Sequence, residues 1–527
     1  MISDGPPARD PGAPGQNNPG GKTASRRVAL AAKLAAILLA ADGISFLVHE
    51  GKAGALAALG LLAGSLGIMA MLSWSLPRLL LALVVFVSCF EGPLKNLAPT
   101  PSTKDVVYLG RDVLLYGGLY LAFRRGELQR IWPRSIPMRS LIVAFLALVA
   151  AQLFNPRGFG PVISLLASRT YWEMIPLFFL GYALMTDLER WPPLVRVALL
   201  CGVANGIAAV VEYQKGPEWL AGLGAGYASM VTGNAARVFI DASGIARLRP
   251  PALGPDMGFA ASMAFFLWPV LLGTWFHPRL RASWPVPLGV LTFLALVFGT
   301  LVSQSRSDIL LSPVMIGAYL LLASRGKVAR IALTAIVIAI VATVGIHLAS
   351  GDFSGVFARY RSVGTLNRTI NTFVTRENRF NTAFKTPFVY FTRYFWGNGM
   401  GKVGPGGGVF VPRKAYHLTN GENEALLMIT ETGSLATLVL LSIHLGFIRL
   451  GFRAWARAPD GPWKALVAIP LATLLAMLLL WPLGNFTTFP GNAAFWFYGG
   501  SLAALAAKFR GPLDPGGLAR KGQACAY

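Results

Sequence analysis

Charged residues are scarce in this sequence. Only 13% of its 527 residues are Asp, Glu, Lys or Arg, whereas 54% are hydrophobic. Soluble globular proteins carry roughly 25% charged residues. The deficit excludes an ordinary soluble fold and indicates lipid as the solvent, because apolar runs recur along nearly the whole chain.

Cysteines, histidines and acids are also few. The three cysteines and five histidines lack the spacing of a disulfide framework or a zinc motif. The sequence therefore predicts no metal site and no cofactor. The formal net charge is +24. Because the basic residues lie between apolar runs instead of on one polar domain, we expect no nucleic-acid partner.

Apolar runs of roughly 17–25 residues are long enough to cross a bilayer. We predict an all-α polytopic membrane protein with about fourteen transmembrane helices in residues 27–510, between tails at 1–26 and 511–527. The predicted spans are 28–48, 54–74, 79–95, 106–123, 140–155, 172–186, 194–211, 258–275, 286–304, 308–323, 331–348, 424–448, 465–484 and 493–507.

The short loops predict the orientation through the positive-inside rule. Their basic residues all fall on one side of the membrane if this span count holds, so both termini are predicted to be cytoplasmic. These residues are Arg124, Arg125, Arg130, Arg134, Arg139, Arg279, Arg281, Arg325, Lys327, Arg330, Arg449, Arg453, Arg457, Lys464, Lys508, Arg510, Arg520 and Lys521. Two long segments, 212–257 and 349–423, then lie outside, with a smaller piece at 156–171. The basic charge of 349–423 fits either anionic lipid headgroups or a phosphate-bearing substrate.

Proline, glycine and arginine cluster before the eighth predicted span, between Arg247 and Gly258. Such helix-breaking backbone is tolerated at membrane depth only where it is buried in protein or lines a wet cavity. We expect Arg249 to face that cavity; alternatively, it extends to lipid headgroups.

A polar turn from Ser303 to Asp308 separates two later spans. Ionisable residues at this depth are costly and usually functional. This makes Arg306 a candidate site residue. The alternative is an ordinary tight turn closed by an Arg306–Asp308 pair.

Acidic residues mark the mouth of the twelfth span. Glu424 and Glu431 are seven positions apart and share a helix face, and Glu422 precedes them. A carboxylate here could accept a proton from a sugar hydroxyl. The alternatives are a solvated loop residue for Glu422 and, for Glu431, a structural acid bonded to a neighbouring span or loop. Upstream, the stretch from Trp396 to Gly401 predicts a glycine-rich turn.

Taken in order, these stretches resemble the O-antigen ligase and O-antigen polymerase superfamily of bacterial envelope proteins, over about residues 190–450. The segment from Arg249 to Gly258 resembles the family's arginine and turn before a span. The segment from Ser305 to Ser307 resembles its Ser-Arg-Gly at a span start. The residues in register with its His-Asn-x-x-Leu…Glu-x-Gly motif are Asn423, Leu426, Glu431 and Gly433. The chain departs from the family at Glu422, where the motif has histidine, and at Pro255-Asp256, where it has Asn-Pro.

The resemblance implies a GT-C-like bundle in a bacterial inner membrane, with a large periplasmic loop between helices 11 and 12. It implies a metal-independent glycosyltransferase whose donor is a glycan on undecaprenyl pyrophosphate. The acceptor would be a lipid-linked repeat unit or a core sugar, and membrane lipids, a chain-length regulator and a flippase are the implied partners. The missing histidine favours a polysaccharide polymerase over a ligase.

The resemblance also implies roles for residues. Arg249 and Arg306 would stabilise the leaving pyrophosphate, and Glu422, or His417 upstream, would deprotonate the attacking hydroxyl. The implied substrate-binding residues are Arg247, Arg376, Arg379, Asn423 and Glu431. Two alternatives stay open: a flippase or transporter for lipid-linked oligosaccharides, and a non-catalytic subunit of polysaccharide assembly.

Overall fold

A computed structural model describes the parts of the chain on which the fold is based. These are residues 76–96, 111–112, 115–117, 119–120, 123–124, 138–185, 191–233, 238–240, 246–303, 305–323, 386–403, 424–479 and 488–509. They belong to one unit, Ser75–Tyr527. The predicted spans 28–48, 54–74 and 331–348 lie outside the described residues, so the count of about fourteen spans stays a prediction.

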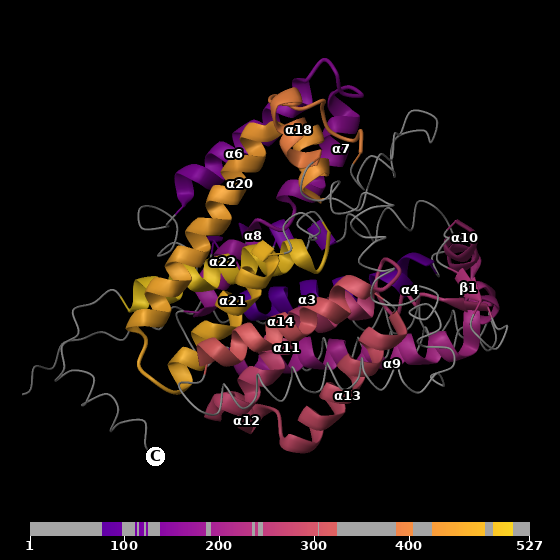
Figure 1. The fold of residues 1–527 in the computed structure, drawn as a ribbon, viewed down its shortest axis with the longest axis vertical. Helices are drawn as coiled ribbons and strands as arrows, with labels where there is room; N and C mark the ends of the chain where they lie inside the picture. The colour runs from indigo at the N-terminus through magenta and orange to yellow at the C-terminus, as the bar shows by residue number, and fades with distance from the viewer. Residues whose placement is uncertain are drawn as a thin grey trace, which may run out of the picture. The chain divides into compact units, whose positions relative to one another are not determined.

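The described residues are helical almost throughout (Figure 1). The helices are α3 (Leu76–Cys89), α4 (Glu91–Asn96), α6 (Arg139–Ala151), η1 (Gln152–Phe154), α7 (Pro161–Trp172), α8 (Pro176–Met185), α9 (Trp191–Gly222), α10 (Ala225–Gly233), α11 (Phe259–Phe276), α12 (Pro278–Ser283), α13 (Val286–Ser303), α14 (Arg306–Ala323), α18 (Thr386–Arg393), α20 (Glu424–Arg457), α21 (Pro462–Leu479) and α22 (Gly491–Lys508). Strands β1 (Val238–Ile240) and β2 (Ala246–Leu248) form an antiparallel hairpin that the all-α prediction did not include.

Five of the described helices, α9, α11, α13, α20 and α21, are long and apolar enough to cross a bilayer. The chain is accordingly a multi-pass membrane protein. Predicted spans 258–275, 286–304, 308–323 and 493–507 coincide closely with α11, α13, α14 and α22. Hydropathy located these helices well because each is bounded by a Pro, Gly or polar turn.

The observed helices differ from the predictions in three places: around α7 and α8, in α9, and in α20. The predicted span 172–186 contains only the ten residues of α8, and the adjoining piece 156–171 is mostly helix α7. This helix begins at Pro161 after Gly160, which is a start signal that hydropathy does not detect. Helix α9 extends beyond the predicted end at 211 and is broken at Gly216. Helix α20 is broken at Gly433, within the predicted span 424–448.

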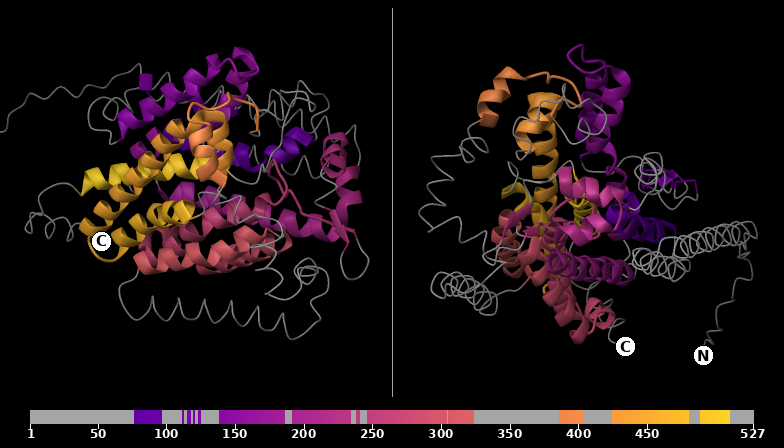
Figure 2. Two further views of the ribbon diagram at one scale, coloured as in Figure 1. Left: turned by 45° about the horizontal axis from the view of Figure 1, so that its top comes forward. Right: turned by 90° about the vertical axis from the view of Figure 1, so that its right-hand side faces the viewer.

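Helix α11 occupies the centre of the described bundle. It packs against α9, α13, α14 and α21, and 83% of its most apolar window is buried. A helix that is apolar on every side is expected in such a position. Helix α20 runs along α6, α21 and α22, and the two further views show it alongside them (Figure 2).

Helices α8 and α22 pack closely against each other. A Cβ atom added at Gly181 would lie 2.2 Å from the Phe497 carbonyl oxygen, and one added at Gly500 would lie 1.9 Å from the Phe178 carbonyl oxygen. The two backbones therefore touch directly, as small residues permit in membranes, where van der Waals packing drives helix association.

We predict that Gly500→Ala lowers the thermal unfolding midpoint of the purified protein in detergent. The added methyl group must displace the α8 backbone, which costs about 1–3 kcal/mol of unfolding free energy. Gly222→Ala is the matched control, because a Cβ atom there meets nothing within 4 Å. Equal midpoints for the two variants would show that the helix pair tolerates separation.

Candidate functional site

The irregular segment from Pro250 to Gly258 is buried in protein, which is one of the two environments predicted for it. The Ala252 N–H donates to the Glu212 carboxylate (2.8 Å), and the Leu253 N–H donates to the Asn205 side-chain oxygen (3.1 Å). The Leu253 carbonyl accepts from the Gly92 N–H (3.1 Å). Side chains of α9 and backbone of α4 thus replace the missing helical hydrogen bonds.

A small apolar cluster holds the strand that leads into this segment. Leu248 of β2 packs with Leu220, Tyr227 and Met257, all of them buried. Burial raises the pKa of the Tyr227 phenol well above its ordinary value, and the Glu212 carboxylate adds to the shift. The phenol therefore stays neutral, and the cluster fixes the chain immediately before Arg249.

Arg249 reaches the break between α13 and α14. Its Nε–H donates to the Ser303 carbonyl oxygen (3.1 Å) at the end of α13. Its guanidinium also lies over Gly258, where a Cβ atom would come within 3.0 Å of it. Two stretches that the sequence singled out separately, those of Arg249 and of Ser303 to Asp308, therefore meet. We call this meeting point the arginine junction.

Asp308 accepts hydrogen bonds from two serines at the arginine junction. Its carboxylate accepts from Ser305 Oγ (2.6 Å) and from Ser262 Oγ (3.5 Å). Arg306 is the first residue of α14, so its backbone lies at this break, while its side chain is outside the described part of the structure. The alternative of an Arg306–Asp308 pair stays untested, and Asp308 has other partners.

Glu431 is a second centre. It is 1% exposed, and its carboxylate accepts from the Tyr171 hydroxyl (2.8 Å) and from the Val403 N–H (3.0 Å). These contacts match the predicted alternative of a structural acid bonded to a neighbouring span and loop. Tyr171 lies on α7, and Val403 lies in the segment that follows α18.

The glycine-rich turn packs directly on the helix break near Glu431. Gly397 and Gly433 both have positive φ, 77° and 89°, and a Cβ atom on either would lie 2.8 Å from the other's nitrogen. The Asn398 N–H donates to the Thr430 carbonyl (2.7 Å), and the Ser434 N–H donates to the Tyr394 carbonyl (3.2 Å). Backbone of the turn therefore substitutes for helical hydrogen bonds, and this explains the break in α20.

Helix η1 and the residue that follows it complete this second centre. Gln152 Nε2 donates to the Trp396 carbonyl (2.7 Å), and Asn155 Nδ2 donates to the Gly397 carbonyl (3.3 Å). The Trp396-to-Gly401 and Glu431-to-Gly433 stretches, which were predicted separately, thus form one assembly. We call it the glutamate junction.

The remaining predicted site residues cannot be placed in either junction. Their positions, or their side chains, lie outside the described residues. They are Glu422, His417, Asn423, Arg376 and Arg379, together with the side chain of Arg247, whose backbone pairs with Phe239 in the hairpin.

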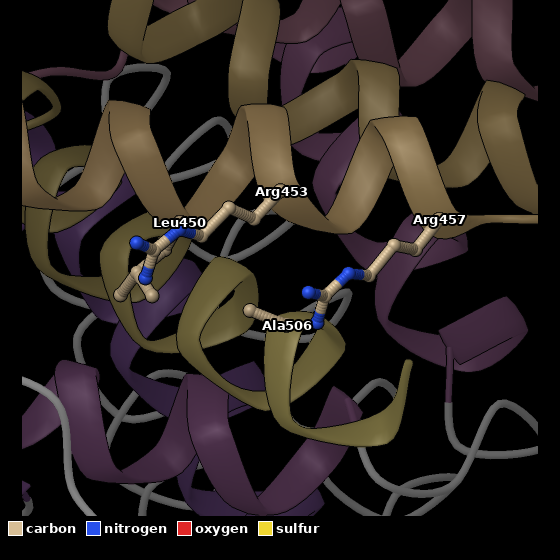
Figure 3. A pocket seen from close by; sticks show the side chains of 4 residues that line it. All are labelled: Leu450, Arg453, Arg457 and Ala506. Carbon is tan, nitrogen blue, oxygen red and sulfur yellow. The ribbon is translucent and has the colours of Figure 1, made fainter. Parts of the chain in front are cut away.

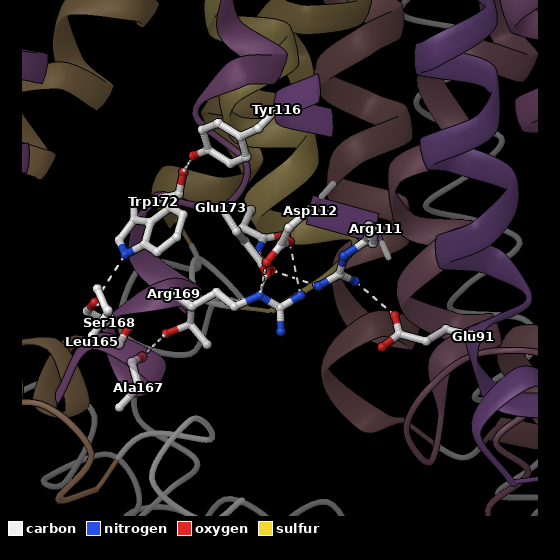
Figure 4. A network of polar contacts seen from close by, with 12 residues as sticks. Glu91, Arg111, Asp112, Tyr116, Leu165, Ala167, Ser168, Arg169, Trp172 and Glu173 are labelled. Atoms are coloured by element: carbon white, nitrogen blue, oxygen red, sulfur yellow. Dashed lines mark hydrogen bonds and ion pairs between the residues drawn. The ribbon is translucent and has the colours of Figure 1, made fainter. Parts of the chain in front are cut away.

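A buried network of charges joins α4, the 111–112 segment and the end of α7 (Figure 4). Arg111 donates from its two terminal nitrogens to Glu91 (2.8 Å) and Glu173 (2.9 Å). Arg169 donates from two nitrogens to the Asp112 carboxylate. It also forms an ion pair with Glu173 through Nε (3.1 Å). The Arg111, Arg169, Glu91 and Glu173 side chains are at most 7% exposed.

Charges in this network balance. When the ion pair between Lys95 and Glu91 is included, the network contains equal numbers of cationic side chains and carboxylates. Asn492 of α22 adds a hydrogen bond to Glu173 (3.4 Å). Balanced pairing is what an apolar interior requires, because an unpaired charge there is very costly.

Helix α7 connects the network to the glutamate junction. Arg169 and the following Glu173 are four positions apart and face the network, whereas Tyr171 lies between them in sequence and points to Glu431. At the other end, Glu91 adjoins Gly92, where a Cβ atom would lie 2.1 Å from the Gly254 carbonyl oxygen. The network therefore includes residues next to the contacts of both junctions: α7 contacts Glu431, and Gly92 contacts the segment after Arg249.

None of these charged residues was among the site residues predicted from the sequence. Their signal was present: Glu91, Arg111 and Asp112 lie within predicted spans 79–95 and 106–123, where ionisable groups are rare. What the sequence does not show is which acid pairs with which base. Among the described residues, no group of His, Cys, Asp and Glu side chains could hold a metal ion.

Compared with known proteins, the chain matches no family model and no curated sequence. The resemblance stated above thus rests on its motifs alone.

We predict that Arg111→Met destabilises the protein by about 3–5 kcal/mol, since it leaves Glu91 and Glu173 buried with less compensation. The measurement is the unfolding midpoint in detergent. Arg281→Met is the control, because it removes the same charge from an exposed position on α12. A midpoint for Arg111→Met equal to that of the control would mean that the network contributes nothing to stability.

For Glu431, we predict that alanine lowers the unfolding free energy by about 1–3 kcal/mol, because the Val403 N–H and the Tyr171 hydroxyl lose their acceptor. Glu431→Gln keeps one side-chain oxygen and should lose less, as should Tyr171→Phe, which leaves the Val403 bond in place. If Glu431→Ala kept its full stability while losing activity, the carboxylate would act on substrate instead of on the fold.

Proposed function

We propose that the chain is a membrane-embedded glycosyltransferase that transfers or polymerises glycan units carried on undecaprenyl pyrophosphate, at the periplasmic face. The single observation that carries the proposal is the Arg249–Ser303 hydrogen bond (3.1 Å). It joins the two arginine-bearing stretches that the family resemblance assigns to the diphosphate. One such stretch alone would be weak support.

The proposed reaction is a displacement at the anomeric carbon of the donor glycan. The acceptor oxygen forms a bond to that carbon while the bond to the phosphate oxygen breaks, and the lipid pyrophosphate departs with the electron pair. Glu422 or His417 takes the proton of the acceptor hydroxyl. Guanidinium groups suit the departing diphosphate because they form two parallel hydrogen bonds to its oxygens.

Arg249 and Arg306 stabilise the charge that develops on the diphosphate in this proposal. A preorganised cation in a water-poor site acts more strongly than it would in water and needs no reorganisation during the reaction. Arg249 is suited to this role because hydrogen bonding to Ser303 and the neighbouring Gly258 fix its position. Arg306 begins α14 at the same break, so the first N–H groups of this helix, which have no acceptor within the helix itself, lie nearby.

The glutamate junction supports the acceptor side in this proposal. Glu431 acts there by holding the glycine-rich turn against α20, close in sequence to Glu422. It is a positioning residue and does not itself transfer the proton.

The buried charge network favours one second candidate, a transporter or flippase for lipid-linked oligosaccharides. Ionisable groups inside membrane bundles often mark a substrate or ion pathway. All acids and bases of this network are mutually paired, however, which suits a structural role equally well.

Replacing Arg306 by Ala or by Lys is predicted to abolish glycan extension without loss of folded protein, because Lys keeps the charge but loses the bidentate fork. The assay is gel analysis of polymer length in cells that express each variant at equal level. Arg281→Ala, at an exposed position, is the control. Normal polymer lengths in the Arg306 variants would exclude the assigned role.

A deletion strain separates the candidate functions. Loss of all polymer from a lipid core indicates a ligase, and single repeat units left on the core indicate a polymerase. Undecaprenyl-linked units that accumulate on the cytoplasmic face would instead support the flippase.

A further inference from the structure

A cavity of about 300 Å³ lies between the ends of α20 and α22, away from both junctions. Leu450, Arg453 and Arg457 line it from α20, and Ala506 lines it from α22 (Figure 3). The three α20 residues are spaced by three and four positions and therefore share one face of the helix. In Figure 3 the Arg457 side chain extends toward Ala506, and the Arg453 side chain extends toward Leu450.

The walls of this cavity combine charge with apolar surface. Leu450 and Ala506 are 3% and 5% exposed and close its inner side, whereas Arg453 and Arg457 are exposed at its mouth. The small Ala506 side chain leaves the space that a larger residue would fill. A ligand that enters must therefore present an anionic group to the arginines and an apolar part to Leu450 and Ala506.

Neither arginine is neutralised by a carboxylate among the residues that the structure describes. The nearby acid Asp460 pairs with Lys464 (2.7 Å) instead. Two guanidinium groups thus border one cavity, and their mutual repulsion is relieved when an anion binds between them. The paired oxygens of a phosphate fit the fork geometry of arginine.

Tryptophans place the cavity at the depth of the lipid headgroups. The Lys464 ammonium lies 4.9 Å from the Trp455 ring, and the Lys508 ammonium lies 4.2 Å from the Trp463 ring. Tryptophan and basic residues concentrate where a membrane helix meets water. Both α20 and α22 also end here, at Arg457 and Lys508.

We propose that this cavity binds the phosphate group of an anionic phospholipid. Arg453 and Arg457 bind the phosphate oxygens, and the first methylene groups of an acyl chain lie along Leu450 and Ala506. Basic pockets between membrane helices on the cytoplasmic side bind lipid headgroups in this way. The positive-inside rule predicts that side for this end of the chain. The proposal does not depend on the glycosyltransferase activity.

The test uses the purified full chain in nanodiscs of phosphatidylcholine, with or without phosphatidylglycerol. Phosphatidylglycerol is expected to raise the thermal unfolding midpoint and to be retained in native mass spectra. Arg453→Gln and Arg457→Gln should each weaken retention about tenfold, since each removes charge-assisted hydrogen bonds. Arg449→Gln is the matched control: it removes the same charge from the same helix, and Arg449 does not line the cavity.

Each other outcome overturns the proposal. Equal loss of retention in Arg449→Gln would show that diffuse positive charge attracts the lipid, without a defined site. Equal stabilisation by inorganic phosphate in phosphatidylcholine nanodiscs would assign the cavity to a soluble anion. If a glutamine variant does not fold, Arg453→Lys and Arg457→Lys replace it; they keep the charge, and unchanged retention in both would exclude recognition by the guanidinium fork.

Discussion

Paired charge inside an apolar bundle is the constraint on which the described structure depends. Arg111 and Arg169 lie among Glu91, Asp112 and Glu173, and each is stable there only because the others are present. The partners come from α4, from the 111–112 segment and from the end of α7. Segments far apart in sequence are therefore held in one arrangement, because moving any of them would leave a buried charge without its partner.

The two junctions take their positions from this arrangement. One side of the network adjoins Gly92, which packs against the segment after Arg249, and the other includes α7, whose Tyr171 binds Glu431. The proposed diphosphate site and the proposed acceptor side thus share one supporting structure. Preorganisation of this kind is what a site needs if fixed cations are to stabilise developing charge.

Irregular backbone within the bundle obeys the same rule as the charges. The Pro250–Gly258 segment and the turn after Trp396 cannot use helical hydrogen bonds, so Glu212, Asn205, Gln152 and Glu431 supply partners. In an environment without water, each unsatisfied group would cost several kcal/mol. Glu212 and Glu431 therefore have a defined structural use, which does not require that they act in chemistry.

The sequence by itself determined the helical, multi-pass character of the chain and the places of α11, α13, α14 and α22, because hydropathy and turn signals act locally. It also singled out both stretches of the arginine junction and both of the glutamate junction. Only the tertiary structure decided that these stretches meet in pairs, that α20 breaks at Gly433, and that Arg111 lies between Glu91 and Glu173. These facts depend on which helices become neighbours. A local pattern carries no information about that choice, since it is made by packing and by charge pairing over the whole bundle.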